Sequence, residues 1–306
     1  MDAESRSSLA APSRRRWRIV FAVAWVLSAS YVLPFVHRGW IPHDEGTLAL
    51  SAERVMRGEV PHRDFDEGYT GGLSYLHAAA FRLGGTQLST LRWMLYGGFL
   101  LFSAATFGIA RRLGPAWLAA LLALLAAAWS VPNYFAGLPS WYNLFLAAFA
   151  TLFLMRSIER SRAGWIFAAG LCAGASILIK QVGFYAVAAG LLFLVYLEQT
   201  ESSARREPGR GRAVFLASKA AAIGVFIGLL AAVFGRRREL MDVLELVVPG
   251  AIVAGYLVWD DLVRGGGASR ERFRALARMT APFLAGVALV LAAFAAGFAS
   301  AGSLKP

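Results

Sequence analysis

Residues 163–197 read AGWIFAAGLCAGASILIKQVGFYAVAAGLLFLVYL, and Lys180 is the only charged residue among them. A membrane-spanning helix needs about 17–25 consecutive, mostly apolar residues. The stretch therefore predicts two spans, 163–179 and 182–197, which are joined by a tight turn with Lys180 at its tip.

Similar apolar runs recur on both sides of this pair. Hydrophobic residues make up 58% of the chain and its mean hydropathy is +0.54, whereas a soluble domain is about 45–50% apolar. We therefore expect an all-α fold, a polytopic transmembrane helix bundle of about eight or nine spans. The candidate spans are roughly 19–36, 93–110, 115–131, 141–155, 163–179, 182–197, 214–234 and 277–299, with an ambiguous short run at 246–259.

The formal net charge of +12 does not indicate a nucleic-acid-binding surface. Basic residues lie in short clusters between the apolar runs, which is the pattern of cytoplasmic loops under the positive-inside rule. The single cysteine, Cys172, excludes an intrachain disulfide. The clusters that follow the rule are 13–18, 111–112, 156–162 and 205–212.

The same rule gives an expected topology in an inner membrane. Residues 1–16 are expected to form a cytoplasmic tail, 17–299 one transmembrane domain, and 300–306 a C-terminal tail. Loop 37–88, segment 132–143 and Lys180 then face the periplasm or the exterior. The sequence GRRREL at 235–240 is expected on that side too, where it breaks the rule.

Loop 37–88 collects many of the titratable groups. Seven of the nineteen acidic residues lie within 41–69, and all four histidines lie in or beside that segment: His37, His43, His62 and His77. Residues 44–57 carry their apolar side chains on one helical face, and Asp44 is the candidate N-cap. Residues 72–83 predict a second amphipathic helix. We therefore expect two interfacial helices that cover one end of the bundle.

The loop also resembles a known family. HDEG at 43–46, GEVPHRDFDEGYTGGLSYLHAAAFRLGG at 58–85 and LR at 91–92 resemble the first outer loop of bacterial GT-C-fold integral membrane glycosyltransferases. The relevant members (family 39/83-like) are similar to protein O-mannosyltransferases, aminoarabinose transferases and Rgt-type transferases. Weaker matches at 170–183 and 235–250 extend the resemblance over roughly 17–250. Many relatives are longer, so a truncated chain, a short form or a decayed copy is expected.

The resemblance implies inverting transfer of a sugar from a polyprenyl-phosphate donor to an acceptor hydroxyl of a lipid, glycan or protein. Such a displacement needs a carboxylate that takes the acceptor's proton and cationic groups on the departing phosphate. We expect Asp44 as the general base, with Glu45 and Asp64 as further site carboxylates. The candidate groups for the donor phosphate are Lys180, Arg63 and Arg92, followed by Arg236–Arg238.

Each of the main candidates also has a structural interpretation. Asp44 would cap a helix, and Glu45 would be a first-turn acid favoured by the helix dipole. Asp64 would cap a turn, and Lys180 would end a span with its ammonium group reaching water.

No cofactor is expected. A divalent metal such as Zn²⁺ or Mn²⁺ is the alternative, with His43 beside Asp44 and with His62 downstream as its ligands. The sequence has no H-x-x-x-H or H-E-x-x-H spacing that would strengthen this hypothesis.

Two other functional classes compete with an enzyme. Between about 93 and 197 the span interiors carry no Asp, Glu or His, which argues against a proton-coupled transporter. A non-catalytic or flippase-like protein that handles lipid-linked glycans stays open. The expected partners are the lipid bilayer, a polyprenyl-phosphate-linked sugar and its acceptor, and no nucleic acid.

Overall fold

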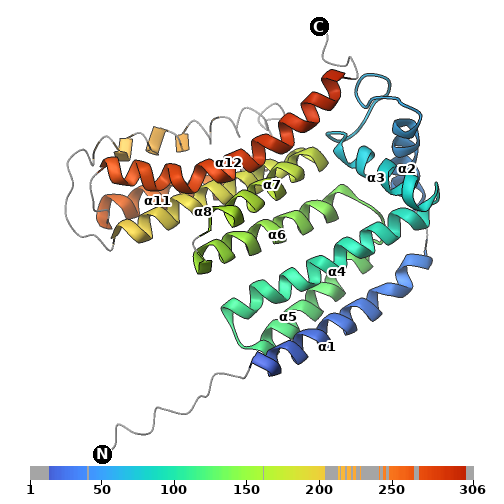
Figure 1. Cartoon of the computed structure of the whole chain (residues 1–306), viewed down its shortest axis with the longest axis horizontal. Helices are drawn as coiled ribbons and strands as arrows, with labels where there is room; N and C mark the ends of the chain where they lie inside the picture. Colours follow the sequence, from blue (N-terminus) through green and yellow to red (C-terminus); the bar gives the residue numbers. More distant parts are fainter. Residues whose placement is uncertain are drawn as a thin grey trace, which may run out of the picture. The chain divides into compact units, whose positions relative to one another are not determined.

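The computed structural model describes residues 14–39, 41–160, 162–203, 248–264 and 269–300, together with scattered residues between 213 and 245 (Figure 1). Within these residues the regular structure is helical, apart from an isolated β-bridge between Pro61 and Phe65. The all-α prediction is therefore confirmed.

The helices have the following bounds in chain order. They are α1 (Arg14–Val32), η2 (Leu33–His37), α2 (Pro42–Met56), α3 (Gly72–Gly84), α4 (Leu88–Leu113), α5 (Ala116–Trp129), η3 (Val131–Asn133), α6 (Pro139–Arg160), α7 (Ala163–Ile179), η4 (Gln181–Gly183), α8 (Phe184–Ser203), α11 (Val248–Arg264) and α12 (Ser269–Ser300).

Six stretches in the described part of the chain are long and apolar enough to cross a bilayer, so the protein is a multi-pass membrane protein. The prediction of eight or nine spans is too high for these residues. One reason is that Ala163–Ile179 is apolar but has only 17 residues. The six stretches are Arg15–His37, Leu88–Leu113, Ala116–Asn133, Pro139–Arg160, Gln181–Glu201 and Arg270–Ser300.

Several predicted features lie outside the described residues. The candidate span 214–234 is described only at scattered positions, and the ambiguous run 246–259 falls largely on the 17-residue helix α11. The predictions for 205–212 and 235–240 lie wholly outside, and those for the tails 1–16 and 300–306 lie outside except at residues 14–16 and 300.

The chain forms two compact units, Met1–Ala186 with Gly286–Pro306, and Val187–Ala285. The expectation of one transmembrane domain over 17–299 stays a prediction. In the first unit α4 packs against α1, α5 and α6, and α6 in turn packs against α7 (Figure 1).

The buried face of α4 shows why this helix is central to the first unit. Leu91, Leu95 and Phe99 follow each other at four-residue spacing and are almost fully buried. The opposite face is also apolar but open, since Trp93 is 46% and Leu101 64% exposed. Because lipid tails are as apolar as leucine, close packing rather than transfer from water holds such helices together.

Small residues bring α7 close to the part of α12 that belongs to the first unit. A Cβ added to Gly286 would stand 2.3 Å from the carbonyl oxygen of Phe167, and one added to Gly174 would stand 3.0 Å from the Cα of Val287. Gly174 and Gly170 form a G-x-x-x-G spacing, which in membranes permits such close approach. Any larger residue at Gly286 would therefore push the two segments apart.

The turn at Lys180 agrees with the sequence prediction. α7 ends at Ile179, and the short helix η4 leads directly into α8 at Phe184. Gly183 is required in this turn, because an added Cβ would lie 2.2 Å from the carbonyl carbon of Ser176.

We call one side of the first unit, which contains α2, α3 and the turn at Lys180, the polar end. α2 and α3 pack against each other there, as Figure 1 shows, and both contact α4. The hydroxyl of Thr70 donates to the carbonyl oxygens of Ile177 at 2.9 Å and Leu178 at 2.5 Å, which ties the loop before α3 to the end of α7. The two predicted helices of loop 37–88 are therefore present, close to Lys180.

The opposite side of the first unit, the basic end, contains the N-terminus of α1 and the C-termini of α4 and α6. Here Arg112 of α4 donates to both carboxylate oxygens of Glu159 of α6, at 2.5 and 3.0 Å. Loops assigned by charge to opposite sides of the membrane thus lie at opposite ends of this unit.

This arrangement predicts the accessibility of two cysteines in a Cys172→Ser background. Gly68 at the polar end and Gly164 at the basic end are both exposed, and an added Cβ meets nothing within 4 Å at either site. We expect an impermeant thiol reagent to label Gly68→Cys from outside intact cells, and Gly164→Cys only after the cells are opened. Labelling of both from the same side would contradict the topology.

Candidate functional site

Asp44 lies at the polar end in the first turn of α2. The helix begins at Pro42 with Ile41 at its N-cap, so the prediction that Asp44 is the N-cap is wrong. Its Oδ2 instead accepts a hydrogen bond from the phenol of Tyr134, which belongs to the segment between η3 and α6. This hydrogen bond raises the pKa of Tyr134, so the phenol stays protonated and holds the carboxylate in one orientation.

Lys180 reaches the same segment from the turn after α7. Its Nζ donates to Ser140 Oγ at 3.4 Å and lies 5.6 Å from the centre of the Tyr69 ring. Among the described residues no carboxylate lies within ion-pair distance of Lys180. Likewise, no described basic side chain forms an ion pair with Asp44. Both charges are therefore available to a ligand.

The segment 134–141 connects the two predicted residues. Trp141 donates its indole N–H to the carbonyl oxygen of Tyr134 at 2.9 Å, and its neighbour Ser140 contacts Lys180. Tyr134 and Ser140 were not predicted as site residues. The available signal was the position of this aromatic, polar segment on the same predicted side as loop 37–88.

Glu45 and Arg92 form a buried, bidentate ion pair. Arg92 Nε lies 2.6 Å from Glu45 Oε1, and Arg92 Nη2 lies 2.7 Å from Glu45 Oε2, with the two side chains 8% and 3% exposed. Glu45 also accepts the backbone N–H of Ile41 at 3.0 Å. The remaining guanidinium hydrogens are donated to the carbonyl oxygens of Val36, Arg38 and Gly39.

These contacts tie α2 and the chain before it to α4. Charged hydrogen bonds to Glu45 and to three carbonyl oxygens engage the guanidinium of Arg92. A role of Arg92 at the donor phosphate, and of Glu45 in catalysis, stays a prediction that this geometry does not favour.

Asp64 closes a turn in the linker between α2 and α3. Its Oδ2 accepts the backbone N–H of Val60 at 2.7 Å and a guanidinium hydrogen of Arg63 at 2.6 Å. The Arg63 bond, followed by the Val60 bond, lowers the pKa of Asp64 to about 2. A base that weak cannot take a proton efficiently near neutral pH. The turn-capping interpretation of Asp64 therefore fits its surroundings better than a catalytic one.

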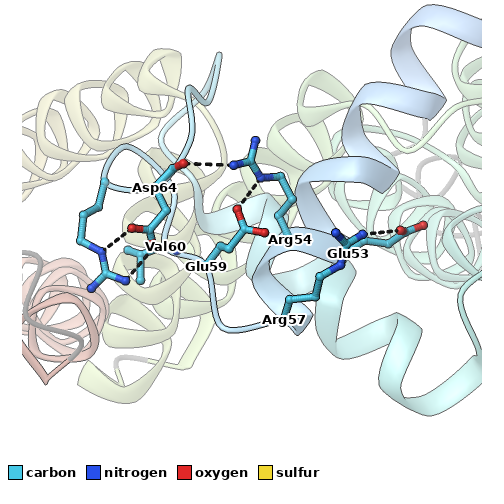
Figure 2. Close-up of polar contacts among 7 residues, drawn as sticks. Glu53, Arg54, Arg57, Glu59, Val60 and Asp64 are labelled. Carbon is cyan, nitrogen blue, oxygen red and sulfur yellow. Dashed lines mark hydrogen bonds and ion pairs between the residues drawn. The ribbon is translucent and has the colours of Figure 1, made fainter.

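Figure 2 shows how Arg54 of α2 holds this linker. Arg54 Nε lies 2.6 Å from Glu59 Oε2, and its Nη2 donates to the carbonyl oxygen of Asp64 at 3.0 Å. The guanidinium also stacks 4.5 Å from the centre of the Phe65 ring. The linker that follows α2 is thus folded back onto that helix.

The histidines proposed as metal ligands are exposed. His62 lies in the linker turn with a left-handed φ of 65°, and His43 lies in the first turn of α2. Within the part of the chain that is described, no group of three His, Cys, Asp or Glu side chains could hold a metal ion.

His77 of α3 is fully buried, and neither ring nitrogen has a hydrogen-bond partner. Its ring centre lies 5.8 Å from that of Tyr142, and a Cβ on Gly137 would come within 3.2 Å of it. Burial lowers the pKa of His77 to about 4, so the ring is neutral near pH 7.

The second unit contains a charged network that the sequence did not indicate. Arg272 of α12 binds both oxygens of Glu198 at 2.8 and 2.9 Å and one oxygen of Asp261 at 2.7 Å. Lys219 donates to the other oxygen of Asp261 at 3.1 Å. All four side chains are at most 4% exposed. Their signal in the sequence was weak, because each charge is next to an apolar run and reads as the end of a span.

Comparison with known proteins adds no assignment, because no family model, curated protein or solved structure matches the chain.

The buried pair predicts a large cost for removing one partner. Arg92→Met leaves the Glu45 carboxylate buried and unpaired, and it should lower the free energy of unfolding by about 3–5 kcal/mol. Glu45→Met/Arg92→Met should be less destabilised than Arg92→Met, because no lone charge remains. Thermal unfolding in detergent micelles measures both effects.

Arg57→Met is the control for this experiment. It removes an exposed ion pair between Glu53 of α2 and Arg57 at the C-cap of this helix, so it should change stability by less than about 1 kcal/mol. An Arg92→Met protein as stable as the wild type would show that the pair does not hold α2 in place.

Buried His77 predicts a loss of stability in mild acid. The unfolded chain binds a proton on this residue below about pH 6.5, whereas the native chain does not until about pH 4. Stability is therefore full above pH 6.5 and should fall by roughly 3 kcal/mol as the pH drops to 4. His77→Phe should remove this part of the decline, as measured by unfolding at a series of pH values. The exposed control His62→Gln should retain it, and equal declines in wild type and His77→Phe would refute the assignment.

Proposed function

We propose that the protein is a membrane glycosyltransferase that transfers a sugar from a polyprenyl-phosphate donor to an acceptor hydroxyl at the polar end. The observation that carries the proposal is that segment 134–141 holds both Asp44, through Tyr134, and Lys180, through Ser140. A carboxylate and an ammonium group, neither in an ion pair with a described residue, thus border one segment. The resemblance of loop 37–88 to the GT-C-fold enzymes supports the same function.

The chemistry assigned to these groups is a single displacement. Asp44 takes the proton of the acceptor hydroxyl while the acceptor oxygen forms a bond to the anomeric carbon of the sugar. The bond from that carbon to the phosphate oxygen breaks on the opposite face, which inverts the configuration. The phosphate leaves with the electron pair, and Lys180 stabilises the developing charge with help from the Ser140 hydroxyl.

The location of these residues suits a lipid-linked donor. α2 and α3 are amphipathic helices next to the ends of spans, so a polyprenyl tail can stay in lipid while its phosphate reaches Lys180. In this proposal the polar end faces the periplasm or the exterior of an inner membrane, as the basic clusters indicate. Glu45 and Arg92 act through the position of α2 and do not touch the substrate.

The proposal predicts a specific effect of Asp44→Asn. The asparagine oxygen still accepts the Tyr134 hydrogen bond, but the amide cannot take a proton at neutral pH. Turnover should therefore fall by roughly 10²–10⁴-fold while thermal stability stays unchanged. The assay is transfer of a labelled sugar from a polyprenyl-phosphate donor in proteoliposomes.

Asp66→Asn is the matched control, because Asp66 is an exposed acid of the same loop. It should transfer sugar at the wild-type rate. Wild-type turnover by Asp44→Asn would exclude Asp44 as the base.

A second candidate is a flippase-like protein that moves a lipid-linked glycan without transferring its sugar. The buried ion pair of Glu198 and Arg272 in the second unit favours it, since both residues belong to candidate spans and ionisable groups within spans often mark substrate paths. The same proteoliposomes separate the two functions, because a transferase consumes the donor and a flippase relocates it intact.

A further inference from the structure

A groove at the basic end has no part in the proposed reaction. It has a volume of about 730 Å³ and lies between α1, α4 and α6. Its wall on α4 runs from Leu101 to Arg112, which is about 17 Å at 1.5 Å per residue. One leaflet accounts for half of the roughly 30 Å hydrocarbon core, so the groove is about as long as one acyl chain in its leaflet.

The lining changes in character along this length. The part farther from the basic end is apolar and is formed by residues such as Leu101, Ala104 and Phe149. The part nearest the basic end is lined by three arginines and one acid, namely Arg111, Arg112, Arg156 and Glu159. An apolar channel that ends in positive charge fits a molecule with an apolar tail and an anionic head.

Two of the arginines are free to bind that head. Arg112 is engaged by Glu159 and by the carbonyl oxygen of Gly108. Arg111, in contrast, donates one hydrogen bond to the carbonyl oxygen of Gly114 at 3.0 Å, and Arg156 lies 5.1 Å from the Trp165 ring centre. Among the residues that the structure describes, neither Arg111 nor Arg156 has a carboxylate within ion-pair distance.

We propose that this groove binds an anionic glycerophospholipid, with an acyl chain along α4 and its phosphate between Arg111 and Arg156. A zwitterionic lipid would leave the excess positive charge unbalanced, and a free phosphate would leave the apolar wall unfilled. A polyprenyl chain is much longer than one leaflet, whereas a phospholipid acyl chain matches the groove. The basic residues also assign this end to the cytoplasmic leaflet, where anionic phospholipids attract arginine side chains.

The test uses delipidated full-length protein in detergent, titrated with phosphatidylglycerol or with phosphatidylcholine of identical acyl chains. Bound lipid is counted by native mass spectrometry. The wild type should prefer phosphatidylglycerol, and Arg111→Gln/Arg156→Gln should bind it about 30-fold more weakly, from about 1 kcal/mol for each lost arginine. Ala104→Phe should also weaken binding, because it fills the apolar part and leaves all the arginines in place.

The control is Arg160→Gln/Arg162→Gln, which removes the same charge at the same end from residues that do not line the groove. It should bind phosphatidylglycerol like the wild type. If Arg111→Gln/Arg156→Gln proves unstable, Arg156→Gln alone keeps the Arg111 bond to Gly114 and replaces it in the comparison.

Three results would overturn the proposal. The first is equal binding of the two lipids by the wild type, and the second is an equal loss of binding in the control, which would indicate general surface attraction. The third is displacement of phosphatidylglycerol by inorganic phosphate at equal concentration, which would indicate an anion site without a lipid.

Discussion

The buried ion pair of Glu45 and Arg92 is the constraint on which the polar end depends. Removing two charges from water costs several kcal/mol, and only good geometry and further hydrogen bonds offset it. Here the pair is bidentate, and the carbonyl oxygens of Val36, Arg38 and Gly39 accept the remaining guanidinium hydrogens. The first turn of α2 is thereby fixed on α4, so the neighbouring Asp44 meets Tyr134 in a defined orientation.

The helices whose bounds follow from the length of an apolar run were predictable from the sequence. The pair of apolar runs around Lys180 gave the boundaries of α7 and the start of α8 to within two residues, because a single charge divides them. The start of α2 was not predictable from Asp44 as a cap. Pro42 has a fixed φ suited to the first helical position, and the side chain of Glu45 satisfies the N–H of Ile41, so the helix begins earlier. Among the described residues the number of spans was overestimated, because apolar runs were counted without knowing which become long helices.

The candidate site was predictable in part. The lone lysine between two spans pointed to Lys180 from residue type and place. Asp44 was preferred as the base only because loop 37–88 resembles the GT-C-fold enzymes, since its position alone favoured a helix cap. Their partners Tyr134 and Ser140 depend on tertiary contacts between distant segments, which one sequence does not reveal. The same limit applies to Arg92, which pairs with a residue 47 positions away, and to the network around Arg272 in the second unit.

The central claim is that a lipid-linked phosphate binds at the polar end beside Lys180. The most direct test is photo-cross-linking of the full-length protein in membranes with a polyprenyl-phosphate analogue whose photoreactive group lies next to the phosphate. The account predicts cross-links in residues 134–141 and around Lys180, strongly reduced in Lys180→Gln and unchanged in Arg111→Gln/Arg156→Gln. Cross-links confined to the basic end, or unaffected by Lys180→Gln, would contradict it.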